Sequence, residues 1–232
     1  MTKETIRERV WDDLEESGVA RFPFPPHGRI PNYAGATEAA DRLADRSAWR
    51  TAETIKANPD APQLPVRRRA LRDGKRLYVA VPRLSDERCF LELDPTEVED
   101  VDAATTVSGI SEHGRPVAPD EVAPIDLIVS GSVAVSADGA RVGKGEGYSD
   151  LEFALLAERG LVGDGTTVAT TVHERQVVDG IDDADHDVRI DLVGTPERVI
   201  RTEADDRPTG IDWDLLDDDR LEEIPALSSL RD

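Results

Sequence analysis

The sequence predicts an α/β fold, a three-layer α/β/α sandwich in which helices cover both faces of a mostly parallel sheet. Patterns of helix and strand alternate along the chain, and the strand candidates are almost continuously apolar, as strands buried on both faces are. The runs RLYVAV at residues 76–81 and IDLIVSGSVAV at residues 125–135 are of this kind. At 232 residues with 38% apolar content, the chain can form one sizeable core. We therefore expect one α/β domain over residues 1–202 and an acidic segment, residues 203–232, packed on it.

The first quarter of the chain is expected to be helical apart from a proline-rich arm. Residues 3–17 carry apolar side chains at every fourth position and stop at a glycine, which predicts a helix with a narrow apolar stripe. Residues 21–33 contain four prolines and are expected to be an ordered arm without regular structure. Short helices are expected at residues 36–43 and 49–57.

The remainder alternates between the two element types. A helix at residues 64–72 stops before a glycine and leads into the strand at 76–81. The later elements are a central strand at 125–135, a helix at 149–159, and strands at 166–172 and 188–193.

The chain is strongly acidic, with a net charge of −21 and only four lysines. Such a lysine-poor surface suggests a halophile, because concentrated salt screens the repulsion between carboxylates; an acidic mesophilic protein is the alternative. A field of this sign repels nucleic acid and anionic membranes, so neither is expected as a partner. A phosphate ligand would need a local cluster of cations or amides.

Several common sites are not indicated by the sequence. Cys89 is the single cysteine and lacks the context of a nucleophile, the four histidines have no zinc spacing, and no GxSxG motif is present. The first residues are charged and no run is long enough to span a membrane. We expect a cytoplasmic protein that is a monomer or a weakly associating dimer.

A glycine-rich stretch, GARVGKGEGYSD at residues 139–150, lies between the predicted central strand and a helix. Gly143, Gly145 and Gly147 alternate, so their backbone amides can approach an anion closely. Arg141 and Lys144 add positive charge to the same loop.

The start of the next helix adds to the features of the loop that would suit an anion. Ser149 and Glu152 have the spacing of a capping box, which would place a helix N-terminus and its partial positive charge beside the glycines. The spacing matches neither the P-loop nor the dinucleotide fingerprint, so phosphate binding and a flexible hairpin with a helix cap remain equally open.

Three charged residues are further candidates for phosphate or metal binding. Asp150 could hold a magnesium ion that bridges phosphates, or it could simply be a favourable charge in the first turn of a helix. Lys3 and Arg7 are one helical turn apart and could clamp a polyphosphate, although a solvated helix face is the commoner reason for such a pair.

The glycine loop resembles that of the 5-formyltetrahydrofolate cyclo-ligase family, whose form is G-x-R-L-G-[RK]-G-x-G-Y-Y-D. The N-terminal helix is similar to that family's K-x-x-[LI]-R pattern through Lys3, Ile6 and Arg7. Further similarity is found at Gln176, His186–Asp187 and Thr195–Pro196. The chain resembles in particular the branch named for its methenyltetrahydrofolate synthase domain, through residues 22–36, 58–63, 143–152 and 223–225. The RNA-recognition module of some of those relatives is missing here, so nucleic-acid binding is not expected.

The resemblance implies a fold like that of ribose-5-phosphate isomerases and CoA transferases. It also implies an ATP- and magnesium-dependent ligase that cyclises 5-formyltetrahydrofolate, a reduced folate of one-carbon metabolism, to 5,10-methenyltetrahydrofolate. ATP contacts implied in this way are Lys3, Arg7, Arg141, Gly143, Lys144, Gly145 and Gly147. Lys144, Tyr148 and Arg141 would act in catalysis, Asp150 would bind magnesium, and Asp60, Gln63 and Tyr148 would contact the folate.

The sequence departs from the family's pattern on the folate side. Ser149 replaces a second tyrosine, Asp60 stands where a glutamate is expected, and Gln63 replaces a threonine. Gly131–Ser132 replaces a Pro-Gly pair after the central strand. These departures favour an alternative function, a non-cyclising paralogue that binds nucleotide or folate in a regulatory or salvage role. Another enzyme of the isomerase or CoA-transferase type on the same fold is a third, less supported hypothesis.

Overall fold

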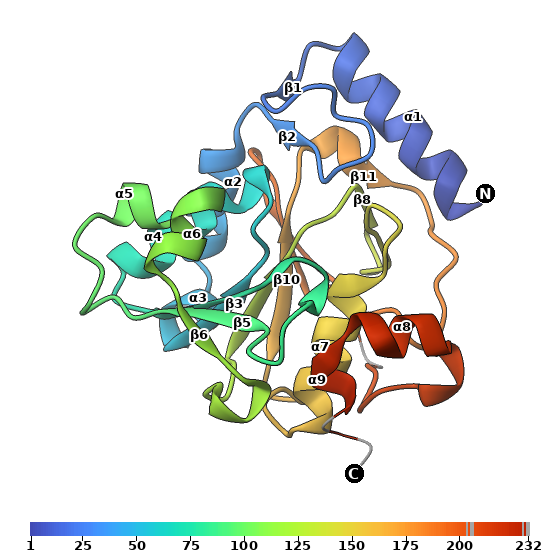
Figure 1. Cartoon of the computed structure of the whole chain (residues 1–232). Coiled ribbons are helices and arrows are strands. Elements are labelled where there is room, and N and C mark those ends of the chain that lie inside the picture. Colours follow the sequence, from blue (N-terminus) through green and yellow to red (C-terminus); the bar gives the residue numbers. More distant parts are fainter. Residues whose placement is uncertain (203, 205–206, 229, 231–232) are drawn as a thin grey trace.

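A mixed eight-stranded sheet forms the centre of the protein (Figure 1). The computed structural model describes residues 1–202, 204, 207–228 and 230. The neighbouring parallel strands are β12 (Leu192–Gly194), β10 (Thr167–Thr171), β7 (Leu127–Ser130), β3 (Thr54–Ala57) and β4 (Arg76–Ala80). Antiparallel strands extend both edges, β13 (Val199–Arg201) beside β12, and β5 (Phe90–Leu93) with β6 (Arg115–Val117) beside β4. The predicted mostly parallel α/β fold is confirmed.

The two faces of the sheet pack separate cores because successive side chains of a strand point to opposite sides. Leu77 and Val79 join the cluster on one face, whereas Tyr78 and Ala80 join the cluster on the other. The first face is covered by α2 (Ala36–Ala44), α3 (Ser47–Thr51), α4 (Leu64–Arg72), α5 (Val101–Ala104) and α6 (Val107–His113). The second is covered by α7 (Tyr148–Glu158), α8 (Asp218–Glu223) and α9 (Pro225–Ser228) (Figure 1).

A third core lies under the N-terminal helix α1 (Lys3–Glu16). There Ile6 and Leu14 pack against Val133 and the small sheet of β11 (Val177–Val178), β8 (Ala134–Ser136) and β9 (Arg141–Val142). The proline-rich arm adds the two-stranded ribbon of β1 (Ala20–Arg21) and β2 (Asn32–Tyr33). This packing brings the start of α1 close to the loop that follows β9.

Short 3₁₀ helices complete the described structure: η1 (Ala61–Gln63), η2 (Pro82–Leu84), η3 (Pro119–Glu121), η4 (Glu174–Gln176) and η5 (Trp213–Leu215). The C-terminal part of the chain is anchored by Ile211, Ile224 and Leu227, which are buried in the same cluster as α7. Of the predicted segment 203–232, residues 203, 205–206, 229 and 231–232 lie outside the described residues.

Several predicted elements need correction. The run 125–135 is not one strand, because the chain leaves the main sheet after β7, at Gly131, and enters the small sheet as β8. A Cβ at Gly131 would lie 3.0 Å from the Ile30 side chain and 3.2 Å from that of Asp60, so a larger residue at this exit would force these side chains to shift by a few tenths of an ångström. Residues 49–57 are not one helix: α3 ends at Thr51 and β3 begins at Thr54. The predicted strand 188–193 begins only at Leu192.

Candidate functional site

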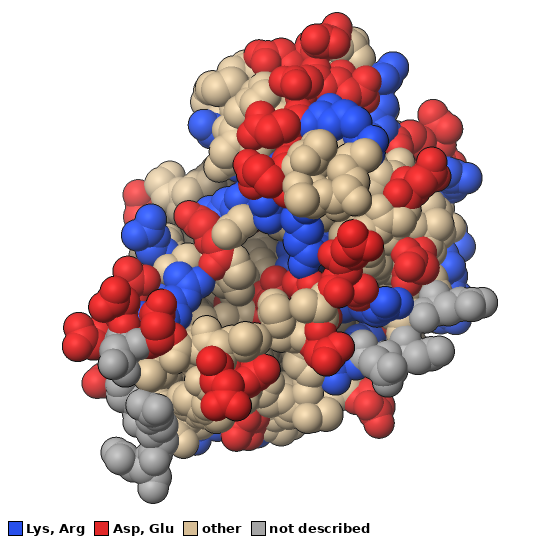
Figure 2. Space-filling model, turned by 90° about the vertical axis from the view of Figure 1, so that its right-hand side faces the viewer, with Lys and Arg blue, Asp and Glu red and all other residues tan. Residues whose placement is uncertain are grey.

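A cleft of about 500 Å³ opens at the carboxyl ends of β3 and β4, between the start of α1 and the glycine loop. This is the edge of an open α/β sheet at which ligands commonly bind. Figure 2 shows that the face on this side of the molecule is hollowed near its middle, with basic side chains at the hollow and acidic ones over much of the surrounding surface. The cleft therefore gathers cations in a chain of net charge −21.

The glycine loop, residues 143–147, connects β9 to α7 and forms one wall of the cleft. Gly145 and Gly147 have φ of +106° and +71°, values that side-chain-bearing residues resist. Gly147 is the N-cap of α7 and supplies no side-chain cap. The predicted capping box is thus wrong: α7 begins at Tyr148, so Ser149 and Glu152 both lie inside the helix. The helix N-terminus nevertheless faces the loop, as predicted, and supplies backbone amides there.

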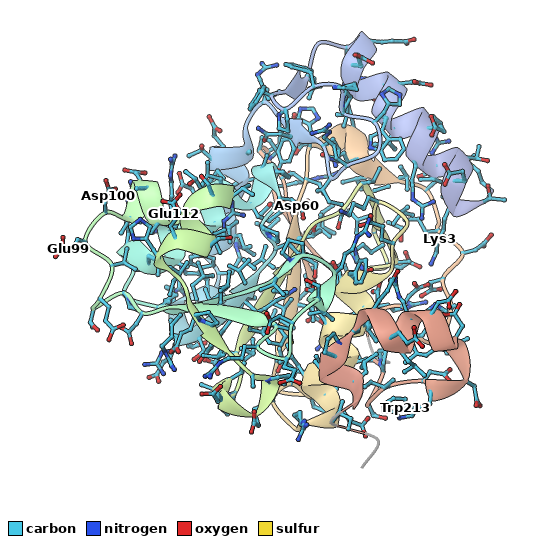
Figure 3. All side chains as sticks on the ribbon, viewed as in Figure 1. Lys3, Asp60, Glu99, Asp100, Glu112 and Trp213 are labelled. Carbon is cyan, nitrogen blue, oxygen red and sulfur yellow. The ribbon has the colours of Figure 1, made fainter. Side chains whose placement is uncertain are left out.

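Arg7 and Lys3 meet this loop although they lie some 140 positions away in the sequence. The Arg7 Nε donates to the carbonyl oxygen of Gly143 at 2.8 Å, and a side chain at Gly145 would meet the Arg7 Cζ at 3.3 Å. Lys3 also lines the cleft and forms an ion pair with Asp187. Figure 3 shows Lys3 at the α1 end of the site. The predicted juxtaposition of α1 with the glycine loop is present in the structure.

The cations of the cleft are paired with carboxylates at its surface. Lys144 lies 2.7 Å from Glu146, with 41% and 39% of their side chains exposed, and Arg7 lies 2.5 Å from the exposed Glu4. An ion pair exposed on both sides, such as Lys144–Glu146, contributes only about 0–1 kcal/mol, and in the Arg7–Glu4 pair the carboxylate is 67% exposed. Little free energy is therefore lost when a polyphosphate, which is a stronger acceptor, replaces Glu146 or Glu4.

Arg141 and Asp150 contact each other beneath the loop. One Arg141 nitrogen lies 2.7 and 2.8 Å from the two Asp150 oxygens, and another donates to the Gly131 carbonyl at 3.0 Å. Asp150 also accepts from the Val188 amide at 3.1 Å. The Asp150 carboxylate is therefore held by Arg141 and the Val188 amide at the wall of the cleft, and its role as a magnesium ligand stays a prediction. Both residues line the cleft and tie β9 to the first turn of α7.

Asp60 lines the cleft just beyond the end of β3, and Figure 3 shows it near the middle of the molecule. Its burial raises the pKa of the carboxyl above the ordinary value, and the positive charges of Lys144 and Arg67 only partly oppose this rise. Gln63 lies three positions on, but it is fully buried and does not line the cleft. Its amide oxygen and nitrogen find no hydrogen-bond partner among the described residues.

Buried Arg67 holds the turn that carries Asp60. Its guanidinium donates to the carbonyl oxygens of Asn58 at 2.6 Å, Asp60 at 2.9 Å and Thr105 at 3.0 Å. Burial is the main cause that lowers its pKa to about 10, so the group stays charged at neutral pH. The sequence predicts a helix around Arg67 but no role for this residue, because a buried arginine has the same local pattern as an exposed one.

A buried polar cluster under the cleft was missed by sequence analysis. Lys56, on β3, forms an ion pair with Glu152 of α7, and both side chains are almost fully buried. Asn58 accepts from Lys56 at 3.4 Å and donates to the Ser149 hydroxyl at 3.1 Å. Lys56 is one of only four lysines in the sequence, and its two immediate neighbours are apolar, which was the available signal. The Ser149 hydroxyl thus belongs to a network that joins α7 to the end of β3.

Arg83 is a second residue that sequence analysis missed. It lines the cleft from η2, is exposed, and has φ of +59°, an uncommon conformation for a residue with a side chain. Among the residues that the structure describes, no hydrogen bond or ion pair of its side chain is found. Arg83 is therefore a cation at the cleft without an internal carboxylate partner in that part of the chain.

Tyr148 lines the cleft and contacts the C-terminal segment, and its roles in catalysis and in folate binding stay predictions. The Arg220 guanidinium lies 4.1 Å from the centre of its ring, a cation–π distance. The Tyr148 hydroxyl donates to Glu223 at 3.5 Å. Arg220 also donates to the carbonyl oxygen of Glu146, so α8 contacts the glycine loop directly.

Other kinds of site find little support in the described ranges. No group of three or more histidine, cysteine, aspartate or glutamate side chains is placed there to hold a metal ion. Burial raises the pKa of the Cys89 thiol to about 12, which keeps it protonated and unreactive at neutral pH. Among the same residues, no helix combines the length and apolar character that crossing a membrane requires.

Comparison with known proteins agrees with the family resemblance of the glycine loop and the N-terminal helix. Residues 2–196 match the 5-formyltetrahydrofolate cyclo-ligase family. The whole chain aligns with methenyltetrahydrofolate synthase domain-containing proteins, at 44% identity in Mus musculus and 38% in Homo sapiens. The chain spans only 64% and 62% of the length of those two relatives.

A solved structure supports the fold. The 5,10-methenyltetrahydrofolate synthetase of Aquifex aeolicus superposes with a TM-score of 0.56 over 93% of this chain and all of that protein. At 18% sequence identity, this similarity concerns the fold alone.

Proposed function

Since the chain belongs to the 5-formyltetrahydrofolate cyclo-ligase family, we propose that it converts 5-formyltetrahydrofolate and ATP to 5,10-methenyltetrahydrofolate, ADP and phosphate. The observation that carries this proposal is the meeting of Arg7, Lys3 and Lys144 with the glycine loop in one cleft. A chain of net charge −21 repels polyanions elsewhere on its surface, so a local cluster of cations and free amides has a specific use in binding polyphosphate.

In the proposed reaction the formyl oxygen on N5 attacks the γ-phosphorus of ATP, and the bond from that phosphorus to ADP breaks. N10 of the folate then adds to the activated formyl carbon. N10 loses its proton, and the carbon–oxygen bond breaks as inorganic phosphate leaves. The protein's contribution is positioning and charge neutralisation, as in other phosphoryl transfers.

Each part of the cleft has a place in this scheme. Amides of the glycine loop, with Arg7 and Lys144, would hold the phosphates. Asp60, on the opposite wall at the end of β3, would face the folate. Magnesium bound to the phosphates would supply further charge neutralisation, and no step here depends on a protein ligand for it.

A second candidate is a non-cyclising protein that binds nucleotide or folate. The observation that favours it is the engagement of Ser149 by Asn58, where cyclo-ligases carry a second tyrosine. An aromatic surface of the folate site is thereby replaced by a hydroxyl that is part of an internal network.

A turnover assay separates the two candidates. The protein is incubated with 5-formyltetrahydrofolate and Mg-ATP at low and at high salt, and methenyl product is followed by its absorbance. The proposal expects product that depends on both substrates. Absence of product while the fold and ATP binding are intact would contradict cyclisation and support the binding-only candidate.

Variants test the assignment of the ATP phosphates to the glycine loop and of the folate to the wall that carries Asp60. Lys144→Ala should weaken ATP binding far more than folate binding, and an equal loss of both would contradict the assignment. Arg7→Ala should also weaken ATP binding. Arg9→Ala is the matched control, because Arg9 is exposed on the same helix and does not line the cleft.

A further inference from the structure

A second cavity, of about 640 Å³, adjoins the cleft on the other side of the glycine loop. The two hollows share Gly145, Gly147 and Tyr148 as lining residues, together with Arg83. Asp60 lines the cleft but not this cavity. A ligand whose phosphates contact the loop can therefore extend into the cavity without using the side on which folate is expected.

The outer wall of this cavity comes from the C-terminal segment. Pro208, Ile211, Leu215 and Leu216 line it opposite Leu151 and Ala154 of α7. The family match stops at residue 196, so the whole outer wall lies beyond it. The alignment with the mouse relative nevertheless covers the entire chain, so the two proteins align over this segment as well.

The segment is a packed part of the protein. Ile224 and Leu227 are fully buried against the core that α7 completes. The Ile211 amide donates to Glu158 of α7 at 3.1 Å. Arg220 connects the segment to the glycine loop through the Glu146 carbonyl and the Tyr148 ring. The cavity therefore has two fixed walls.

Charge distinguishes the cavity from the cleft. Asp212 and Asp217 line it, and the carboxylates in its lining outnumber the cations Arg83 and Arg220. One oxygen of each of these two aspartates accepts a backbone amide at a helix start, and the structure shows no ion pair of either carboxylate among the described residues. Their negative charge opposes the entry of phosphate or of a folate glutamate tail. The same carboxylates can accept hydrogen bonds from sugar hydroxyls, and the leucine side chains offer an apolar surface to a flat ring.

We propose that this cavity binds the nucleoside part of the nucleotide, so that residues 208–223 select the nucleotide that the glycine loop holds by its phosphates. The base lies between α7 and the leucines of η5 and its flank, and the sugar lies nearer the carboxylates. This inference rests on the proposed function in one respect, the placement of phosphates at the glycine loop.

The test compares ATP with inorganic tripolyphosphate, which has the phosphates but no nucleoside. Leu215→Asn removes an apolar contact without a change in charge, and 57% of this side chain is exposed, so the fold should survive. Ala154→Leu narrows the cavity from the α7 side. The control is Val107→Asn, at a side chain on α6 that is 64% exposed and outside the lining of the cavity.

Leu215→Asn should lose about tenfold in ATP affinity, as expected for one lost apolar contact, and Ala154→Leu should also weaken ATP binding because its larger side chain takes space from the nucleoside; tripolyphosphate affinity should be unchanged in both. The control should match the wild type with both ligands. Equal weakening of ATP and tripolyphosphate, or unchanged ATP binding in both variants, would overturn the inference. If the wild-type protein makes no methenyl product but both variants lose ATP affinity, this inference stands and the proposed cyclisation fails. If the wild-type protein makes product but both variants bind ATP normally, cyclisation stands and this inference fails.

Discussion

Replacing Gly145 with alanine should weaken ATP binding with a smaller effect on the stability of the fold. The residue has φ of +106°, and an added Cβ would lie 3.3 Å from the Arg7 Cζ and 3.5 Å from its Nη2. Alanine in such a conformation costs about 1–3 kcal/mol. The guanidinium of Arg7 must also shift by a few tenths of an ångström.

The magnitude follows from the position of the loop. Residues 143–147 form a connection at the surface of the cleft, so the variant loop can relax to a less strained conformation in the free protein. ATP must then restore the original conformation, and the strain is subtracted from its binding free energy. A penalty of about 1–3 kcal/mol corresponds to roughly a fivefold to 150-fold rise in the ATP dissociation constant.

Gly160→Ala is the matched control for this experiment. Gly160 follows the far end of α7 and also has a positive φ, +67°. Apart from its two chain neighbours, no described residue has an atom within 4 Å of the place that a Cβ would occupy. This variant should lose about 1–2 kcal/mol of unfolding free energy without a change in ATP affinity. Calorimetric titration measures both variants. Unchanged ATP affinity in Gly145→Ala, or an equal loss in both variants, would refute the reasoning.

Three further variants probe the site. Because burial raises the pKa of Asp60, its ionisation opposes folding as pH rises above the ordinary range of an aspartate. Asp60→Asn should therefore unfold at higher denaturant than wild type at neutral pH, and the difference should vanish in acid; a variant less stable at neutral pH would contradict this. Lys56→Met should lower the free energy of unfolding by about 3–5 kcal/mol because Glu152 is left buried and unpaired. Adding Glu152→Gln should restore part of that stability in the same denaturation experiment, and no recovery would argue against the pair. Arg83→Asn should keep wild-type stability, since asparagine tolerates a positive φ. It should bind ATP roughly fivefold more weakly, because about 1 kcal/mol of Coulomb attraction at 4 Å in water is lost. Unchanged ATP affinity in a calorimetric titration would exclude a contact between Arg83 and phosphate.

Local patterns predicted the α/β class and most of the parallel strands, but β3 lies in a segment expected to be helical and α5 and α6 were not predicted. The apolar run 76–81 is short and bounded by Gly74 and Pro82, which favours a buried strand, and the spaced glycines at 143–147 indicate a close approach of backbone to a ligand or neighbour. The run 125–135 was misassigned because hydropathy does not record that Gly131 lets the chain turn out of the main sheet against Ile30 and Asp60.

The site was only partly predictable because many of its contacts join residues that are far apart in the sequence. Arg7 and Gly143 meet through tertiary packing of α1, and the resemblance to a family, rather than any local pattern, placed them together. Lys56, Glu152 and Arg220 acquire their contacts only in the folded chain. Glu152 also shows that a good capping-box spacing yields to packing, since the helix begins one residue earlier, at Tyr148, and turns this side chain toward Lys56.

A crystal structure of the protein with a non-hydrolysable ATP analogue would test the central claim most directly. The account predicts that the triphosphate lies against the amides of residues 143–147 within hydrogen-bonding reach of Arg7 and Lys144, with Glu4 and Glu146 displaced from those cations. Phosphates bound elsewhere, or a loop still occupied by its own ion pairs at saturating analogue, would contradict it.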